Sequence, residues 1–146
     1  MNINRFVVSA VCTLSLAACS EPVATIPGGQ LSGEANDAPV EWAAVPGTIQ
    51  LETRPTDPYS INIWSVGIGS DLYVATGAEG TRWSGFIDED RSVKARLGRR
   101  LYPLHAMEVD DPTERARVAA AYTDKYDIDE VDGWVAKGLI FRLDRR

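Results

Sequence analysis

Histidine and cysteine are scarce in this 146-residue sequence, which limits the catalytic chemistry open to it. His105 is the single histidine, and Cys12 and Cys19 are the two cysteines. As a general base, His105 would need a substrate proton within hydrogen-bond reach; as a metal ligand, it would need two or three partner side chains. No second histidine or nearby cysteine supplies them. We therefore interpret His105 as a core or rim residue bonded to a backbone carbonyl, and we predict no metal site.

Three acidic clusters offer carboxylates for calcium binding or for acid–base hydrolysis. They are Asp88-Glu89-Asp90, Asp110-Asp111 and the acids of residues 127–132. None has the spacing of an EF-hand loop. The first two lie at expected element boundaries, where acids serve as caps and turn residues. We interpret these two as structural and the third as a solvated loop, with weak cation binding by that loop as the alternative.

Other reactive motifs are incomplete. The Gly77-Ala78-Glu79-Gly80 loop lacks the spacing and the lysine of a phosphate-binding P-loop, so we interpret it as a turn that needs a positive φ. Neither a Gly-x-Ser-x-Gly nor a Ser-x-x-Lys motif occurs. A basic stretch is interpreted as a solvated strand face, with binding of an anionic ligand or partner as the alternative; it contains Lys94, Arg96, Arg99 and Arg100.

The start of the chain indicates export. A predominantly apolar run, Phe6–Leu16, precedes two alanines and Cys19, which is typical of a signal peptide and its cleavage site. The run is shorter than the roughly 20 apolar residues of a permanent membrane span. Leu16-Ala17-Ala18-Cys19 resembles the lipobox of bacterial lipoproteins, which implies lipid on Cys19 as the membrane contact. By the same resemblance, Ser20 favours the periplasmic face of the outer membrane; an ordinary secretory signal is the alternative.

The rest of the chain has the composition of an acidic globular domain. The formal charge is −6, and the leader contains one charged residue, Arg5, so residues 19–146 carry −7. This charge argues against nucleic acid as a partner and against electrostatic docking on anionic lipid. With Cys12 removed and Cys19 lipidated, no thiol remains for a disulfide, a metal site or a nucleophile.

Patterning divides the chain into a signal peptide (residues 1–18), a lipidated flexible tether (19–39) and a folded domain (40–146). The tether is rich in Pro, Gly, Ser and acids and lacks apolar periodicity. In the domain, β-rich stretches predict strands and apolar positions at helical spacing predict helices. The predicted strands are 48–53, 60–68, 71–76, 92–97, 100–109 and 139–143, and the predicted helices are a short one around 83–87 and a long one over 111–126.

Local signals add detail to this pattern. Gly69-Ser70-Asp71 and Gly98-Arg99 are predicted hairpin turns. The long helix is expected to begin with Asp111 as N-cap, Pro112 in the first helical position and Glu114 in the third.

Mostly antiparallel strands with helices in the gaps indicate a small barrel or a curved sheet. We expect Trp64 and Trp83 to line its interior or a pocket beside it. The succession of Leu72–Thr76, Arg82-Trp83, a strand pair and Ala120–Tyr126 resembles the FMN-binding split barrels, which include pyridoxamine-phosphate oxidases, flavin reductases and deazaflavin-dependent nitroreductases, and an uncharacterised bacterial family grouped with them. The resemblance implies an α+β fold: a small antiparallel split β-barrel with one short and one long helix. Many split barrels complete their cofactor site across a dimer, so the resemblance also implies a homodimer.

The resemblance also implies a cofactor site at the start of the short helix. Carried over to this sequence, Thr76, Arg82 and Ser84 would contact the phosphate of FMN or a deazaflavin, and Trp83 would flank its ring. A guanidinium offers a planar fork to phosphate, and a helix N-terminus adds amide donors.

Three functions follow as hypotheses. We favour an envelope lipoprotein whose barrel binds a small molecule or partner, with no assigned catalysis and no required cofactor. The first alternative is an oxidoreductase that uses flavin or deazaflavin, and the second is a structural envelope protein. The leader lacks a twin-arginine motif, which argues against export of a pre-folded holoprotein and favours binding over catalysis.

Overall fold

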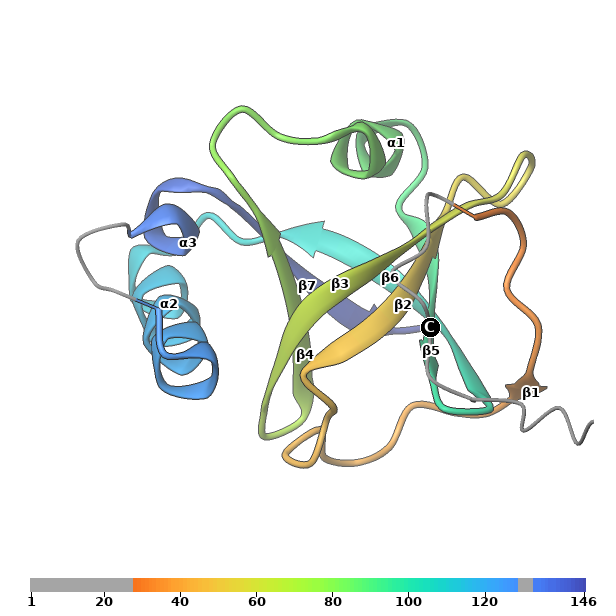
Figure 1. Ribbon diagram of the computed structural model, residues 1–146, viewed down its shortest axis with the longest axis horizontal. Coiled ribbons are helices and arrows are strands. Elements are labelled where there is room, and N and C mark those ends of the chain that lie inside the picture. Colours follow the sequence, from red (N-terminus) through yellow and green to blue (C-terminus); the bar gives the residue numbers. More distant parts are fainter. Residues whose placement is uncertain (1–27, 129–132) are drawn as a thin grey trace, which may run out of the picture.

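Six antiparallel strands close into a barrel in the computed structural model, which describes residues 28–128 and 133–146 (Figure 1). Around the barrel the order is β6–β5–β2–β3–β4–β7, and a further pairing of β7 with β6 closes the circle. The strands are β2 (Thr48–Thr53), β3 (Tyr59–Ile68), β4 (Asp71–Thr76), β5 (Ser92–Leu97), β6 (Arg100–Glu108) and β7 (Leu139–Arg145). The predicted α+β split barrel is therefore confirmed.

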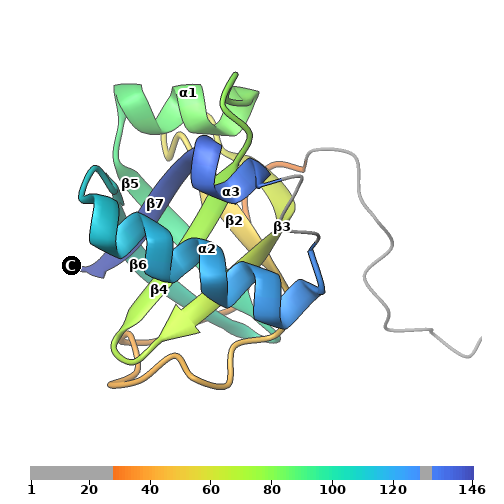
Figure 2. The ribbon, with the colours of Figure 1, turned by 90° about the vertical axis from the view of Figure 1, so that its left-hand side faces the viewer.

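One extra strand and three helices complete the described part of the fold. Strand β1 (Glu34–Ala35) pairs in parallel with β6. Helix α1 (Arg82–Glu89) and helix α2 (Pro112–Tyr126) are the two predicted helices, whereas the short α3 (Trp134–Lys137) was not expected from the sequence. Figure 2 shows α2 lying across the outside of the barrel and α1 at one end. Within the described chain, no helix has the length and hydrophobicity of a membrane span.

The side chains alternate between two apolar layers, as the pleat of a strand requires. Inside the barrel, Leu51, Val74 and Leu104 are fully buried in the larger cluster. Outside it, Tyr73 and Ile140 pack beneath Val118 of α2 in a second cluster. Burial of both layers is what fixes α2 on the barrel.

Local signals account for the boundaries of these elements. Asp111 accepts a hydrogen bond from the Glu114 amide (2.7 Å) and Pro112 opens α2, as predicted. Both hairpin turns are confirmed as well, with Gly69 at φ +57° and Gly98 at φ +59°. A positive φ is the conformation that glycine adopts without a steric penalty.

The alternation along β3 corrects the prediction for Trp64. Its neighbour Ile63 points into the barrel, so Trp64 lies on the outer face and is 46% exposed. The indole stacks on the Tyr126 ring, with 4.6 Å between centroids and 7° between planes. Trp83, in contrast, is buried in the inner cluster, as expected.

The barrel has two distinct ends. Strands β2 and β4 finish, and β3 and β5 begin, at the end that carries α1; we call it the α1 end. The opposite end carries the turns at Gly69-Ser70 and Gly98-Arg99, and we call it the turn end.

Residues 28–36 form a strap across the outside of the barrel. The strap begins beside Ser60 of β3, where the amide and carbonyl of Gly28 exchange 2.8 Å hydrogen bonds with that residue. It then crosses β2, where the Leu31 amide donates to the Glu52 carboxylate. It ends on β6, where the Asn36 amide donates to the Leu101 carbonyl (2.8 Å).

Part of the segment predicted as a flexible tether, residues 28–36, is instead held on the barrel. The strap is held mainly by backbone hydrogen bonds, which leave no side-chain periodicity in the sequence, and Leu31 is its one buried apolar side chain. Residues 19–27 of that segment lie outside the described residues, as do the leader and Cys19.

The Glu52 carboxylate anchors the strap, so we predict that Glu52→Ala lowers the free energy of unfolding by about 2–3 kcal/mol. Glu52 is 2% exposed and accepts from both the Leu31 amide and the Lys94 ammonium (2.7 Å). Its loss leaves both donors without an acceptor. Urea denaturation of residues 19–146 carrying Cys19→Ser measures the effect, and exposed Glu41→Ala is the matched control. An unchanged urea midpoint in Glu52→Ala would contradict this role.

Candidate functional site

The four site residues predicted from the sequence meet at the α1 end. Thr76 is the last residue of β4, and Arg82, Trp83 and Ser84 form the first turn of α1. The intervening loop is tight: the Gly80 amide donates to the Gly77 carbonyl (2.9 Å), and Gly80 has φ +68°. This confirms the turn predicted for the glycine-rich loop.

Three of these four side chains face inward. Trp83 packs edge-on against Phe141 in the barrel core, with 5.6 Å between ring centroids. Ser84 is 2% exposed, and its hydroxyl accepts from the Thr81 amide and donates to the Thr81 carbonyl, both at 2.8 Å. Thr76 is buried as well. Trp83 thus packs α1 on the barrel and Ser84 caps its first turn, and the roles of all three in ligand binding stay predictions.

Arg82 is the predicted site residue that presents its polar atoms to the surface. Its guanidinium carbon lies 5.5 Å from the centre of the Tyr59 ring and 5.8 Å from that of Phe86. The two rings contact each other edge-on, at 5.3 Å. Arg54 lies against the same Phe86 ring, at 4.2 Å. We call Arg54, Tyr59, Arg82 and Phe86 the arginine–aromatic cluster.

The two arginines of the cluster differ in charge balance. Arg54 forms an ion pair with Asp57 (2.7 Å) and also donates to the Asp57 carbonyl (2.8 Å), so its charge is neutralised locally. Arg82 has no carboxylate within 4.0 Å among residues 28–128 and 133–146. Arg82 is consequently the cation of this cluster that remains available to an anion.

The chemistry of the cluster suits binding. A guanidinium recognises a phosphate with two parallel hydrogen bonds, and aromatic rings provide apolar contact for a planar group. The cluster contains no carboxylate, histidine or thiol, so it supplies no general base or strong nucleophile of its own.

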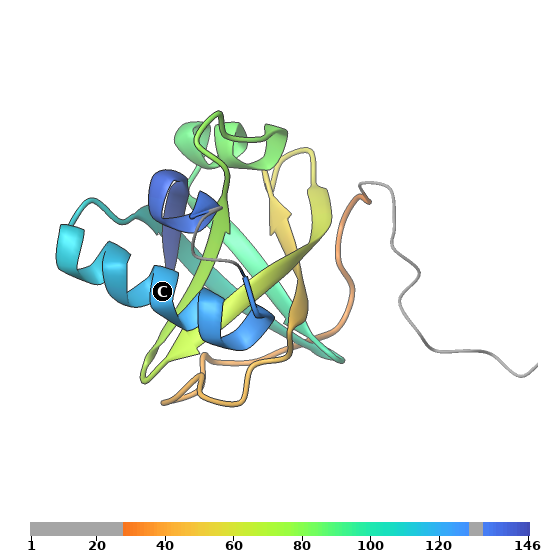
Figure 3. The ribbon, with the colours of Figure 1, turned by 60° about the vertical axis from the view of Figure 1, so that its left-hand side comes forward.

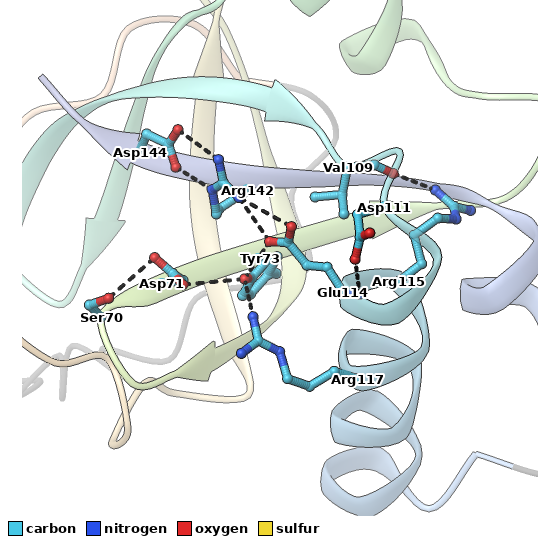
Figure 4. A network of polar contacts seen from close by, with 10 residues as sticks. All are labelled: Ser70, Asp71, Tyr73, Val109, Asp111, Glu114, Arg115, Arg117, Arg142 and Asp144. Atoms are coloured by element: carbon cyan, nitrogen blue, oxygen red, sulfur yellow. Dashed lines mark hydrogen bonds and ion pairs between the residues drawn. The ribbon is translucent and has the colours of Figure 1, made fainter.

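A second polar group lies where α2 meets the barrel (Figure 4). The Tyr73 hydroxyl donates to a Glu114 carboxylate oxygen (2.8 Å) and accepts from Arg117 (3.1 Å). Arg142 of β7 links the same Glu114 (2.9 Å) to Asp144 (2.6 Å).

The Tyr73 group is structural because its polar atoms satisfy one another. Burial, followed by the hydrogen bond to Glu114, raises the pKa of Tyr73 above its usual value. A tyrosine with a raised pKa is a poor base, and here its proton serves to join α2 to β4. The hydrogen bonds that Arg142 donates to the Asp144 and Glu114 carboxylates raise the pKa of Arg142.

Arg99 and Arg100 of the basic stretch are exposed, as predicted, but three side chains of the stretch also contact the strap or the Glu52 carboxylate that anchors it. Lys94 pairs with Glu52 (2.7 Å), and Arg96 donates to the Ser32 carbonyl (3.0 Å). Arg99 lies 3.7 Å from the Glu34 carboxylate. These cations are engaged by the protein itself, which leaves less charge for an anionic partner at this place.

The remaining residues considered from the sequence are His105 and the acidic clusters. His105 is exposed on β6, opposite Asp144 of β7, so of the two predicted placements, core or rim, the core is wrong. Asp90 follows α1 and accepts from the Ser92 amide (2.8 Å), which lowers the pKa of Asp90. In the described chain no group of three His, Cys, Asp or Glu residues is placed to hold a metal ion. In the third cluster, Asp127 is the C-cap of α2, whereas Asp129, Glu130 and Asp132 lie outside the described residues.

A cavity of about 300 Å³ opens between α2 and α3. Small side chains and Trp134 line most of it, and Thr123 and Asp124 supply its polar side chains. Its described lining contains no cation that could bind a phosphate, so the cavity differs in this respect from the arginine–aromatic cluster.

Comparisons with known proteins support the fold. No protein-family model matches the sequence, and no curated protein sequence matches it significantly. Among solved structures, a Listeria innocua protein with the provisional name pyridoxamine 5′-phosphate oxidase is similar (TM-score 0.56, 12% identity, 69% of this chain and 85% of that chain covered). A FAD-binding protein from Mesorhizobium loti gives a TM-score of 0.54 at 14% identity, with 71% and 83% covered.

A third similar structure comes from Bacteroides thetaiotaomicron and has the provisional name 5-nitroimidazole antibiotic resistance protein. Its TM-score is 0.53 at 12% identity, with 68% of this chain and 72% of that chain covered. At such identities the likeness establishes a shared fold, the split barrel.

The raised pKa of Tyr73 predicts a loss of stability in alkali. An unfolded tyrosine ionises at about pH 10, whereas folded Tyr73 keeps its proton to higher pH. Its stabilising contribution is therefore complete below about pH 10 and declines as the pH rises above it. We expect the free energy of unfolding to fall less between about pH 9 and pH 11 in Tyr73→Phe than in the unsubstituted protein. Parallel slopes in urea denaturation across this range would refute the assignment.

Proposed function

We propose that this protein is a membrane-anchored binding protein whose split barrel takes up a planar, phosphate-bearing ligand at its α1 end. The observation that carries the proposal is the exposed Arg82 guanidinium, which lies beside the Tyr59 and Phe86 rings and has no carboxylate partner within the described residues. Flavin mononucleotide is the representative of this ligand class.

The cluster offers a ligand both a positive charge and an apolar surface. Arg82 supplies the positive charge that a phosphate needs in a protein of net charge −6. The Tyr59 and Phe86 rings supply apolar surface, and Arg54, fixed by Asp57, packs on the Phe86 ring. Two similar structures are named as a FAD-binding protein and, provisionally, a pyridoxamine 5′-phosphate oxidase. FAD and pyridoxamine 5′-phosphate each combine a planar ring with phosphate.

The second candidate function is an oxidoreductase that uses flavin or deazaflavin. The likeness to the FAD-binding protein favours it, and a bound flavin would supply hydride and electron transfer. Arg82 fits the phosphate of such a cofactor. The buried Thr76, Trp83 and Ser84 would reach it only after a local rearrangement of α1, which makes simple binding the better-supported function.

We further propose that the protein lies in the bacterial cell envelope, at the periplasmic face of the outer membrane. Lipid on Cys19 would provide the attachment, since acyl chains anchor a protein without help from surface charge. A purely structural role in the envelope is the outcome if no ligand of this class binds.

Arg82→Ala should weaken the binding of FMN by about tenfold or more, which corresponds to roughly 1.4 kcal/mol or more. The reason is the loss of the charge-assisted hydrogen bonds to phosphate. Quenching of FMN fluorescence by residues 19–146 with Cys19→Ser measures the affinity at fixed salt. Arg100→Ala, an exposed arginine at the turn end, is the matched control and should bind as the parent does.

The same titration separates the two functions. Reduction of retained FMN by NADPH without oxygen would favour the oxidoreductase, and retention without reduction would favour the binding protein. Equal FMN affinities of the Arg82→Ala and Arg100→Ala variants, or no binding at all, would contradict the α1 site.

Cys19→Ser in the full-length chain should move the protein from the membrane fraction to the soluble fraction, because it removes the acceptor for lipid. Fractionation of cells followed by immunoblotting checks this. Persistence of the variant in the membrane fraction would contradict lipid anchoring at Cys19.

A further inference from the structure

We propose that the α1 end of the barrel faces the lipid bilayer, so that the arginine–aromatic cluster opens toward the membrane surface. This inference rests on the proposed lipid attachment at Cys19, and it adds an orientation that attachment alone does not require. The partner surface is the headgroup layer of the membrane that holds the anchor.

The chain enters the fold at the α1 end. Gly28 forms a two-way backbone bridge with Ser60, the second residue of β3. The approach is close, since a Cβ added at Gly28 would lie 2.9 Å from the Ser60 hydroxyl. Ser60 adjoins Tyr59 of the cluster, and Figure 3 shows the first coloured residues on the same side of the barrel as the β2–β3 connection and α1. The point of entry is therefore beside the proposed binding site.

The strap prevents the tether from lengthening. Beyond Gly28, the chain is held by Glu52 at Leu31, by Arg96 at Ser32 and by the β1–β6 pairing. Releasing it would expose the buried side chain of Leu31 and leave Glu52 with one fewer donor. The length between the lipid and the barrel is thus limited to residues 19–27.

Nine residues give the tether a short reach. A fully extended chain of nine residues spans at most roughly 32 Å. Ten-residue β3 is about 33 Å long, or about 25 Å along the axis at the usual strand tilt. Turning the barrel over would therefore take up most of the maximum reach of the tether, so the α1 end is favoured at the surface.

Charge does not explain this orientation. In its β2–β3 and β4–β5 connections the α1 end carries three arginines and five acids, so attraction to anionic lipid is not the cause; the arginines are Arg54, Arg82 and Arg91, and the acids are Asp57, Glu79, Asp88, Glu89 and Asp90. The covalent anchor sets the orientation, and we therefore expect it to be the same on zwitterionic vesicles and at high salt. The cluster then meets its phosphate-bearing ligand in the layer between barrel and bilayer.

Fluorescence energy transfer tests the orientation. The lipidated protein has no other thiol if Cys19 is modified, so a single donor dye can be attached at Glu79→Cys on the α1 end or at Ser70→Cys on the turn end; both positions are exposed. Each protein is reconstituted on phosphatidylcholine vesicles with an acceptor on the lipid headgroup. We expect the transfer efficiency from position 79 to exceed that from position 70 by about twofold or more, given the tether length.

A spacer provides the matched control. Twenty Gly/Ser residues inserted between Ile26 and Pro27 would raise the maximum reach of the tether to about 100 Å, and the two efficiencies should then converge. Equal efficiencies with the natural tether, or a higher one from position 70, would overturn the orientation while leaving the anchor intact. Failure of the Cys19-containing protein to bind vesicles would instead overturn the anchor and, with it, this inference.

Discussion

The edge of β6 that closes the barrel is the constraint on which the rest of the structure depends. One edge of β6 pairs with β5, and the other is shared by β1 at Arg100 and Leu101 and by β7 from Leu104 onward. The Leu101 carbonyl accepts from the strap, so the backbone of Pro103, two residues later, faces the same edge. The missing N–H of Pro103 therefore falls between the two partners, and neither ladder loses a hydrogen bond.

Closure at β6 also determines which parts of the chain become neighbours. Because β1 occupies the edge beside β7, the strap must run across β5 and β2, and it begins beside β3 at the α1 end. The connection from β4 to β5 spans the same end and carries α1. The entry of the chain, the β2–β3 turn and the start of α1 thus lie together, which unites the proposed binding site with the proposed point of attachment.

Signals local in sequence predicted most of the fold. The barrel strands and both longer helices were predicted from strand alternation, glycine turns and the Asp111 cap, because each of these signals depends on neighbouring residues.

Features that depend on contacts between residues distant in sequence were not predicted. The strap relies on backbone hydrogen bonds. Lys125 donates to the carbonyls of Val45 and Ser65, and Tyr59 at the start of β3 contacts Arg82 at the start of α1. In the site, the resemblance to the split barrels indicated Arg82, whereas the inward orientation of Ser84 depends on its bond to Thr81.

The central claim is that the α1 end is the ligand-binding surface, and amide chemical shifts test it most directly. Residues 19–146 with Cys19→Ser, labelled with ¹⁵N, would be titrated with FMN. The account predicts that the largest shift changes cluster at Arg54, Tyr59, Arg82 and Phe86, with little change around the α2–α3 cavity. Changes concentrated at Thr123 and Trp134, or an unaltered spectrum at saturating FMN, would contradict it.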